Sequence, residues 1–191
     1  MMEYEKKLLL TEEEYVTLMK YFQNGSSTKQ INYYFDTDDL SMNKQGITCR
    51  IRYKNGTYKA TVKKHKTDIQ DCSEETVICS ASELVEDVFT SMGLKLQGNL
   101  VTNRTVILKQ NAYMVMLDKN DYLEHTDYEL EIEYTSEKEW QAEHCLREIQ
   151  KYLRTQLPQA DACITYSDLD VIPNKSARFF SALQKKASIL P

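Results

Sequence analysis

Residues 47–63 read ITCRIRYKNGTYKATVK, and apolar and polar side chains alternate along both halves of this stretch. Alternation with a period of two is typical of a β-strand that has one apolar face and one polar face. Asn55-Gly56 stands between the halves, and this dipeptide favours the two-residue turn of a β-hairpin. The stretch therefore predicts a hairpin that presents Arg50 and Arg52 together on one face of its first strand.

The same alternation recurs along the chain and predicts about eight strands, most of them antiparallel to their neighbours. Gln110-Asn111 marks a second tight turn between two of these runs. The expected strands are Glu3 to Leu9, Ile31 to Asp36, Ile47 to Lys54, Thr57 to Lys63, Glu74 to Cys79, Leu100 to Lys109, Ala112 to Tyr122 and Tyr128 to Tyr134.

Amphipathic segments between and after the strands predict four helices. Thr11 with Glu14, and Ser136 with Glu139, have the spacing of a capping box at a helix start. The expected helices run from Thr11 towards Gly25, from Ser82 to Gly93, from Ser136 past Leu153 with Trp140 in the apolar stripe, and from Ser176 to Leu190. No repeat or Pro/Gly/Ser-rich linker divides the sequence, so we expect a single domain over residues 1–191.

Composition narrows the class of protein further. The 191 residues include 24 Lys plus Arg against 29 Asp plus Glu, and this acidic balance argues against general nucleic-acid binding. No apolar run approaches the roughly 20 residues of a transmembrane helix, so we expect no membrane partner. The amino terminus, MMEYEKKLLL, is charged where a signal peptide is apolar, and we expect a cytoplasmic protein with free, mostly buried thiols at its 5 cysteines.

The polar faces of the predicted strands are sorted by charge. Glu129, Glu131 and Glu133 share one strand face, whereas Lys59 and Lys63 share a face of another strand. Like charges in a row repel one another unless opposite charges or ligands lie among them. Two interpretations follow: these faces are solvated surfaces, or they line the inside of a closed barrel whose apolar outer face is covered by the helices.

At the amino terminus, Glu3-Tyr4-Glu5-Lys6-Lys7 resembles the ExExK signature of the CYTH domain, or triphosphate tunnel metalloenzyme, family, which includes thiamine-triphosphatase and class IV adenylyl cyclase. Later stretches match that family in the same order, so the resemblance spans Glu3 to about Lys175. These stretches are Tyr33-Tyr34-Phe35-Asp36-Thr37, Leu40-Ser41-Met42, Arg50-Ile51-Arg52, Ala60-Thr61-Val62-Lys63, Arg104, Asp118 and Glu129-Leu130-Glu131.

The resemblance implies an α+β fold in which an eight-stranded antiparallel β-barrel forms a tunnel with amphipathic helices packed outside. It implies a divalent metal, Mg²⁺ or Mn²⁺, and carboxylate oxygens are the ligands these hard cations take. The implied metal ligands are Glu3, Glu5, Glu129 and Glu131, with Asp118 assisting and Glu133 extending the row. The implied phosphate-binding residues are Lys7, Arg50, Arg52, Lys59, Lys63, Arg104 and Lys175.

Two positions of the family pattern stay open. The last basic group is assigned to Lys175, with Arg178 as the rival. A further glutamate after the lysine strand is either Glu74 or Glu75, because the sequence does not fix the register of that strand.

The resemblance implies metal-dependent hydrolysis of the terminal phosphoanhydride of inorganic triphosphate or of an organic or nucleoside triphosphate, with Glu5, Glu131, Arg52 and Lys7 as the catalytic group. Inorganic polyphosphate is a related ligand. The alternatives are a class IV-type adenylyl cyclase and a module that binds polyphosphate or a nucleotide without turnover. The expected assembly state is a monomer or a homodimer.

Overall fold

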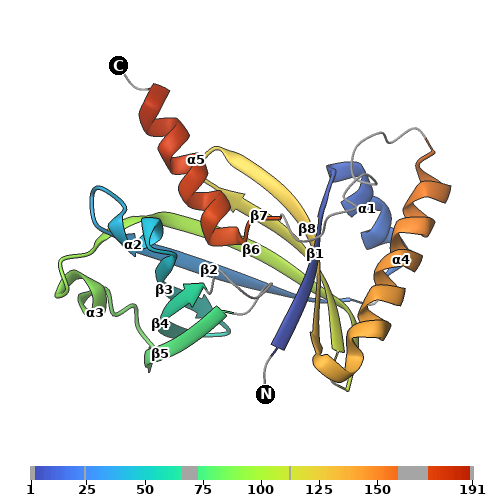
Figure 1. The fold of residues 1–191 in the computed structure, drawn as a ribbon, viewed down its shortest axis with the longest axis horizontal. Coiled ribbons are helices and arrows are strands. Elements are labelled where there is room, and N and C mark those ends of the chain that lie inside the picture. Colours follow the sequence, from blue (N-terminus) through green and yellow to red (C-terminus); the bar gives the residue numbers. More distant parts are fainter. Residues whose placement is uncertain (1–2, 24, 66–72, 112, 159–171, 190–191) are drawn as a thin grey trace. The chain divides into compact units, whose positions relative to one another are not determined.

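Eight strands pair into one antiparallel sheet in the order β1-β8-β7-β6-β2-β3-β4-β5 (Figure 1). The computed structural model describes residues 3–23, 25–65, 73–111, 113–158 and 172–189, and it describes only the backbone of Glu3, His65, Ser73, Glu74 and Ile189. The strands are β1 (Glu3–Leu10), β2 (Ser26–Asp36), β3 (Ile47–Lys54), β4 (Thr57–His65), β5 (Ser73–Ala81), β6 (Lys95–Gln110), β7 (Tyr113–Tyr122) and β8 (His125–Thr135).

Five α-helices and one 3₁₀ turn accompany the sheet within the described residues. They are α1 (Glu12–Tyr21), α2 (Ser41–Lys44), α3 (Asp87–Thr90), η1 (Ser136–Lys138), α4 (Glu139–Gln156) and α5 (Lys175–Ile189). Among the helices described, none is both long and apolar enough to cross a bilayer.

The expected fold class, an eight-stranded antiparallel sheet with helices, is confirmed. The strand order begins with β1 and ends with β5, so the sheet formed by the described residues is open. Closing a sheet into a barrel requires its first and last strands to pair, and the described residues do not include such a ladder. The closed tunnel expected from the sequence therefore stays a prediction.

The β3–β4 hairpin is present as the sequence predicts. Asn55 and Gly56 have positive φ angles of 51° and 80°, which is the backbone of a type I′ turn. The turn sets the register in which Arg52 lies opposite Lys59 and Arg50 lies opposite Thr61. Directly opposed residues share a sheet face, so cations of the two strands lie on the same side.

Two compact units make up the described chain. The first contains β1, α1, most of β8, η1 and α4, and the second contains α2, β3, β4, β5, α3 and α5. The long strands β2, β6 and β7 contribute residues to both units. Each unit has an apolar core of its own.

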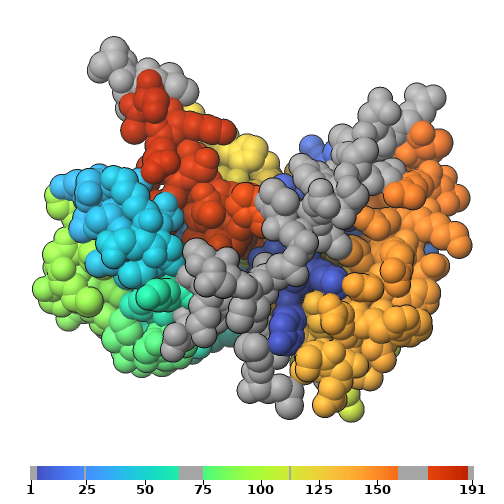
Figure 2. Space-filling view, in the orientation of Figure 1, coloured from blue at the N-terminus to red at the C-terminus, as the bar shows by residue number. Residues whose placement is uncertain are grey.

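In the first unit, α1 and α4 pack on the apolar face of the strands. Leu8, Leu130 and Ile132 are buried in this core, and the buried residues of α4 recur at helical spacing through Leu146 and Ile149. The opposite side of α4 is exposed and carries charged side chains such as Arg147 and Glu148. This helix forms part of the outer surface (orange in Figure 2). The apolar face of this part of the sheet is thus covered by helices, and its other face carries the polar residues.

In the second unit, α5 is held by two phenylalanines. Phe179 and Phe180 pack on Tyr34, with ring centroids 4.8 and 5.7 Å from that of the tyrosine. Gly98 has a φ of 148°, and a Cβ there would lie 3.0 Å from the Phe179 ring. The absence of a side chain at Gly98 therefore lets β6 approach α5 closely.

The acidic stretch that begins at Asp36 is a structural turn. The carboxylate of Asp36 is buried and accepts backbone N–H bonds from Thr37, Met42 and Asn43 at 2.7, 3.0 and 2.9 Å. The bonds from Met42 and Asn43 satisfy amides in the first turn of α2, a short helix that the sequence analysis did not predict. Asp36 therefore orders the connection between β2 and β3.

Two predicted helices differ from the structure. Only Asp87–Thr90 of the segment expected to run from Ser82 to Gly93 is helical, because Phe89 is its sole fully buried side chain and packing supports a single turn. The predicted capping box at Ser136 is wrong. Ser136 begins the 3₁₀ turn η1, so Glu139 is the first residue of α4 and not its third.

The prediction that Trp140 belongs to the buried stripe of α4 is also wrong. Its side chain is 66% exposed, and its ring lies against that of His144 at a centroid distance of 5.3 Å. Trp140 stands in the first turn of the helix, where its side chain projects away from the core built by Ala142 and Leu146.

Cys49 gives a test of burial on β3. Burial, with a smaller contribution from Asp36, raises the pKa of the Cys49 thiol to about 11. We expect iodoacetamide to alkylate Cys49 at pH 8 at least about 100-fold more slowly in the native protein than in urea, because the thiol is buried and its thiolate is disfavoured. Because the folded-state pKa is raised, the contribution of the neutral thiol to stability is complete below pH 9 and is lost as the pH rises through 11. Equal native and denatured labelling profiles, measured by peptide mass spectrometry, would contradict this assignment.

Candidate functional site

One face of the β1–β8 pair carries a concentration of carboxylates. Glu5 lies opposite Glu133, and Lys7 lies opposite Glu131, so these side chains share a sheet face. The alternate residues, such as Leu130, point into the apolar core. We call Glu5, Asp118, Glu129, Glu131 and Glu133 the acidic set.

Three members of the acidic set are deeply buried for charged groups. Asp118 and Glu129 are fully buried, and Glu131 is only 4% exposed. An ionised carboxylate without a partner is costly to bury, so the folded chain must supply counter-charges or hydrogen bonds to this face.

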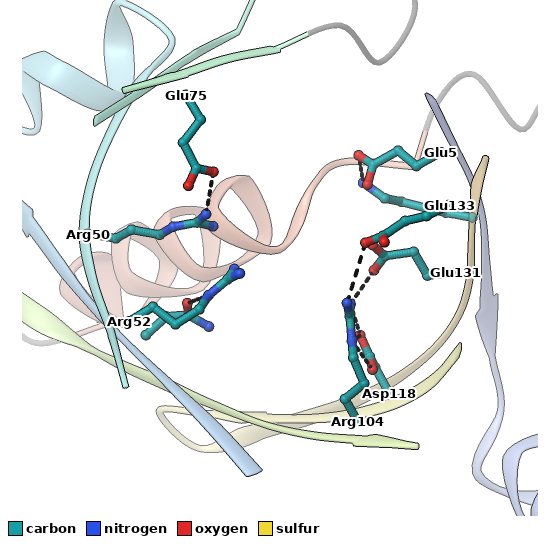
Figure 3. A network of polar contacts seen from close by, with 10 residues as sticks. Glu5, Arg50, Arg52, Glu75, Arg104, Asp118, Glu131 and Glu133 are labelled. Atoms are coloured by element: carbon teal, nitrogen blue, oxygen red, sulfur yellow. Dashed lines mark hydrogen bonds and ion pairs between the residues drawn. The ribbon is translucent and has the colours of Figure 1, made fainter. Parts of the chain in front are cut away.

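Arg104 of β6 supplies the main counter-charge. Its Nε lies 2.9 and 3.2 Å from the two carboxylate oxygens of Asp118, and its Nη2 lies 2.7 Å from one of them. The same Nη2 donates to Glu131 Oε2 at 2.8 Å, and Nη1 lies 3.5 Å from Glu133 Oε1. Figure 3 shows the guanidinium pointing into this group of carboxylates.

The pKa of Arg104 reflects these contacts. Burial of the guanidinium favours its neutral form, but the charges of Glu131, Asp118 and Glu133 outweigh burial and raise the pKa above its ordinary value. Arg104 is thus charged at any pH at which the protein is folded. Lys7 adds a second ion pair on the same face, between its Nζ and the carboxylate of Glu5.

The chemistry of the acidic set suits a hard divalent cation, because every candidate ligand is a carboxylate oxygen. In the described residues, however, no group of three or more Asp, Glu, His or Cys side chains is arranged around a common point as metal ligands would be. Arg104 lies among Asp118, Glu131 and Glu133 instead. The side chain of Glu3 lies outside the described residues, and its backbone pairs with Thr135.

The second unit carries a separate group of cations on β3 and β4. Arg50 and Arg52 alternate on β3, and the register places Lys59 opposite Arg52 and Lys63 opposite Thr48 on the same face. We call Arg50, Arg52, Lys59 and Lys63 the basic set. Its members come from the hairpin whose turn fixes this register.

Neutral polar side chains orient the two arginines. Arg50 donates from Nε to Thr61 Oγ1 at 3.1 Å, and Arg52 donates from Nε to Asn32 Oδ1 at 2.7 Å. Sequence reasoning missed both acceptors as site residues. The alternation along the strands indicates that both acceptors share a face with the arginines, because Thr61 lies opposite Arg50 and Asn32 lies opposite Arg52.

Glu75 resolves one of the open positions. Its carboxylate accepts a 2.6 Å bond from Arg50 Nη2 (Figure 3) and lies 3.7 Å from Lys59 Nζ. The backbone register also places Glu75 opposite Lys63. Of the two glutamates considered for this face, Glu75 is therefore shown among the basic set.

Lys175 and Arg178 both begin the carboxyl-terminal helix near the basic set. Burial raises the pKa of Tyr34, and the charges of Arg50, Arg52, Lys175 and Arg178 act against that rise. Both rivals for the last basic position therefore lie within electrostatic reach of the Tyr34 hydroxyl. Arg178 also donates to the Pro173 carbonyl at 2.7 Å, and the choice of Lys175 stays a prediction.

A cavity of about 400 Å³ occurs in the first unit, and none of the acidic set lines it. It is lined largely by apolar side chains of α1, α4, β6 and β7, including Leu18, Phe22 and Ile149. Its walls belong to the apolar side of the sheet, so the cavity is not part of the acidic set.

Comparison with known proteins places these features in context. A family model described as the CYTH domain matches residues 1–160. The Bacillus subtilis (strain 168) protein YjbK, named as a candidate triphosphatase, is 29% identical over 147 residues, which are 69% of this chain and 76% of that protein.

Two solved structures are similar over almost their whole length. A Bacillus halodurans protein described as a candidate adenylate cyclase has a TM-score of 0.62 at 27% identity, with 94% of this chain and 97% of that chain covered. The Hippeastrum protein HpAC1, a candidate adenylyl cyclase described as having a dominant triphosphatase activity, has a TM-score of 0.64 at 18% identity, with 95% and 96% covered. At that identity the second likeness shows the fold alone.

Arg104→Gln tests whether the acidic set depends on its counter-ion. Removing one partner of a buried ion pair leaves uncompensated charge, so we expect the free energy of unfolding to fall by about 3–5 kcal/mol at pH 7. Since the raised pKa keeps Arg104 charged, the loss should be the same at pH 9. The matched control is Arg147→Gln, whose exposed partner Glu143 lies 3.8 Å away and whose loss should cost under about 0.5 kcal/mol. Urea unfolding followed by circular dichroism measures both, and similar small effects would contradict the structural role of Arg104.

Proposed function

The chain belongs to the CYTH domain family, and from that membership we propose that it is a metal-dependent triphosphatase. The proposed reaction is hydrolysis of the terminal phosphoanhydride of inorganic triphosphate or of an organic or nucleoside triphosphate. The name of the Bacillus subtilis relative supports hydrolysis. The observation that carries the proposal is the sorting of charge along the sheet. One face of the β1–β8 pair holds acidic residues, and one face of the β3–β4 hairpin holds the basic set.

The basic set is suited to binding phosphate. A guanidinium group presents a planar fork of N–H donors that matches two phosphate oxygens, and Lys59 and Lys63 add point charges on the same face. A triphosphate carries about four negative charges near neutral pH, so several cations are needed to hold it. Asn32 and Thr61 orient the Nε edges of Arg52 and Arg50, and the Nη groups are the donors proposed to contact substrate, with phosphate replacing Glu75 at Arg50 Nη2.

The acidic set would hold Mg²⁺ or Mn²⁺ through Glu5, Glu129, Glu131 and Glu133, with Glu3 as a further candidate. When bound, the metal would offset phosphate charge and lower the pKa of a coordinated water. Lys7 lies beside Glu5 and holds that carboxylate in place while also offering a cation to a phosphate oxygen. Electrostatic stabilisation by Arg52 and the lysines is the main contribution of the protein in this proposal, and a covalent nucleophile is not required.

An adenylyl cyclase is the second candidate, because the Bacillus halodurans structure at 27% identity is described as a candidate adenylate cyclase. A cyclase would use the same triphosphate contacts but would expel pyrophosphate and form cyclic AMP. Measuring orthophosphate, pyrophosphate and cyclic AMP from ATP separates the two activities. Binding of triphosphate with none of these products would indicate the non-catalytic module.

Glu131→Gln tests the hydrolase. We expect the wild type to release orthophosphate from inorganic triphosphate, ATP or thiamine triphosphate only with Mg²⁺ or Mn²⁺. The rate of release should fall by about 10- to 100-fold in Glu131→Gln. Glu148→Gln, at an exposed position of α4, is the control and should keep wild-type activity. Release that persists in the presence of EDTA, or full activity of Glu131→Gln, would be incompatible with the proposed site.

Arg52→Ala tests phosphate binding separately from metal. Calorimetry with inorganic triphosphate in EDTA should show binding weakened by more than about 1 kcal/mol, which is the usual least contribution of a charge-assisted contact. Lys64→Ala removes a cation from the next position along β4 after Lys63, where the side chain is exposed and the strand alternation places it on the other face. An equal loss in both variants would mean that overall charge, and not the basic set, binds the ligand.

A further inference from the structure

Arg104 contacts its three carboxylates unequally. Asp118 is fully buried and receives bonds from both Nε and Nη2, whereas Glu131 receives one bond and Glu133 lies at 3.5 Å. The Glu133 side chain is also the most exposed of the three, at 31%. Asp118 is thus the most firmly held partner of Arg104, and the two glutamates of β8 are the more loosely held ones.

The shape of the guanidinium explains this inequality. Its planar fork places the Nε–Nη2 edge on Asp118, so the outer end with Nη1 and Nη2 points at Glu131 and Glu133 (Figure 3). A carboxylate oxygen that accepts from a guanidinium is not available in the same direction to a divalent cation. Arg104 and a metal ion would therefore compete for the glutamates of β8.

We propose that Arg104 is an internal counter-ion that occupies Glu131 and Glu133 until a phosphate group of the substrate attracts its outer edge, and that Asp118 positions Arg104 and is not a metal ligand. This inference rests on the proposed function, because it assigns an order of events to the same acidic set. Asp118 retains the contact with Nε, while Nη1 and Nη2 exchange the glutamates for phosphate oxygens.

The consequence is a positive coupling between anion and cation. A triphosphate that binds Arg104 draws the guanidinium away from the glutamates, so a metal ion can bind them. Conversely, a metal ion on Glu131 and Glu133 repels the guanidinium, which then binds phosphate. Such coupling is reciprocal, because each ligand must raise the affinity of the other by the same factor. The arrangement also keeps buried carboxylates paired when neither ligand is present.

The test measures binding of Mn²⁺ alone, by the electron paramagnetic resonance signal of the free ion, with no triphosphate present. Arg104→Gln should bind Mn²⁺ at least 10-fold more tightly than the wild type. Arg104→Lys keeps the charge but lacks the fork, so it should bind at least 3-fold more tightly. The exposed control, Arg147→Gln, should equal the wild type. Inorganic triphosphate in EDTA should bind Arg104→Gln at least 5-fold more weakly.

Two double variants separate the roles of the acids. Adding Asp118→Asn to Arg104→Gln should change Mn²⁺ affinity by less than 3-fold, whereas adding Glu131→Gln should weaken it by at least 10-fold. Equal losses in the two double variants would overturn the positioning role of Asp118. Unchanged triphosphate affinity in Arg104→Gln would overturn the attraction by phosphate.

Other outcomes distinguish this inference from the proposed function. If Mn²⁺ binds the wild type and Glu131→Gln abolishes binding, but both Arg104 variants equal the wild type, the counter-ion role fails and the metal site stands. If no variant binds Mn²⁺ and hydrolysis needs no metal, both proposals fail. Circular dichroism confirms folding of each variant, and Arg104→Lys carries the test if Arg104→Gln does not fold.

Discussion

The ion pairs of Arg104 are the interaction on which the first unit depends. Period-two alternation places Leu130 and Ile132 in the core under α1 and α4, and it therefore forces Glu131 onto the opposite face beside Asp118. Carboxylates so deeply buried remain charged only if a cation lies among them. Arg104 comes from β6 to supply that cation, so the same contacts stabilise the fold and define the chemistry of the face.

Features encoded locally were predictable from the sequence. The Asn55-Gly56 turn requires positive φ angles that these residues tolerate, and it alone fixes the register of β3 and β4. Alternation then places Arg50 and Arg52 on one face without knowledge of the rest of the chain. The strands and the sheet class were predictable for the same reason, although β2 and β6 begin several residues earlier than the alternation indicated.

Features that depend on distant segments were not predictable. Between Ala60 and Thr61 the pairing of β4 with β5 shifts by one residue, and this bulge brings Glu75 opposite Lys63 where an unbroken ladder would bring Thr76. The contacts of Arg104 with Asp118 and Glu131 depend on side chains from three strands, so the sequence indicated that acids and bases neutralise one another but not which carboxylates Arg104 contacts. Trp140 was misplaced because helical periodicity does not show where a core ends.

The exposure of Trp140 has a consequence for spectroscopy. It is the single tryptophan of the chain, and it stands in solvent on the first turn of α4, against His144. A ring exposed to this degree should emit at the wavelength of a hydrated indole already in the folded protein. Intrinsic fluorescence therefore reports on the outer surface of one helix, while the 13 tyrosines, many of them in the strands, are the chromophores that report on the sheet.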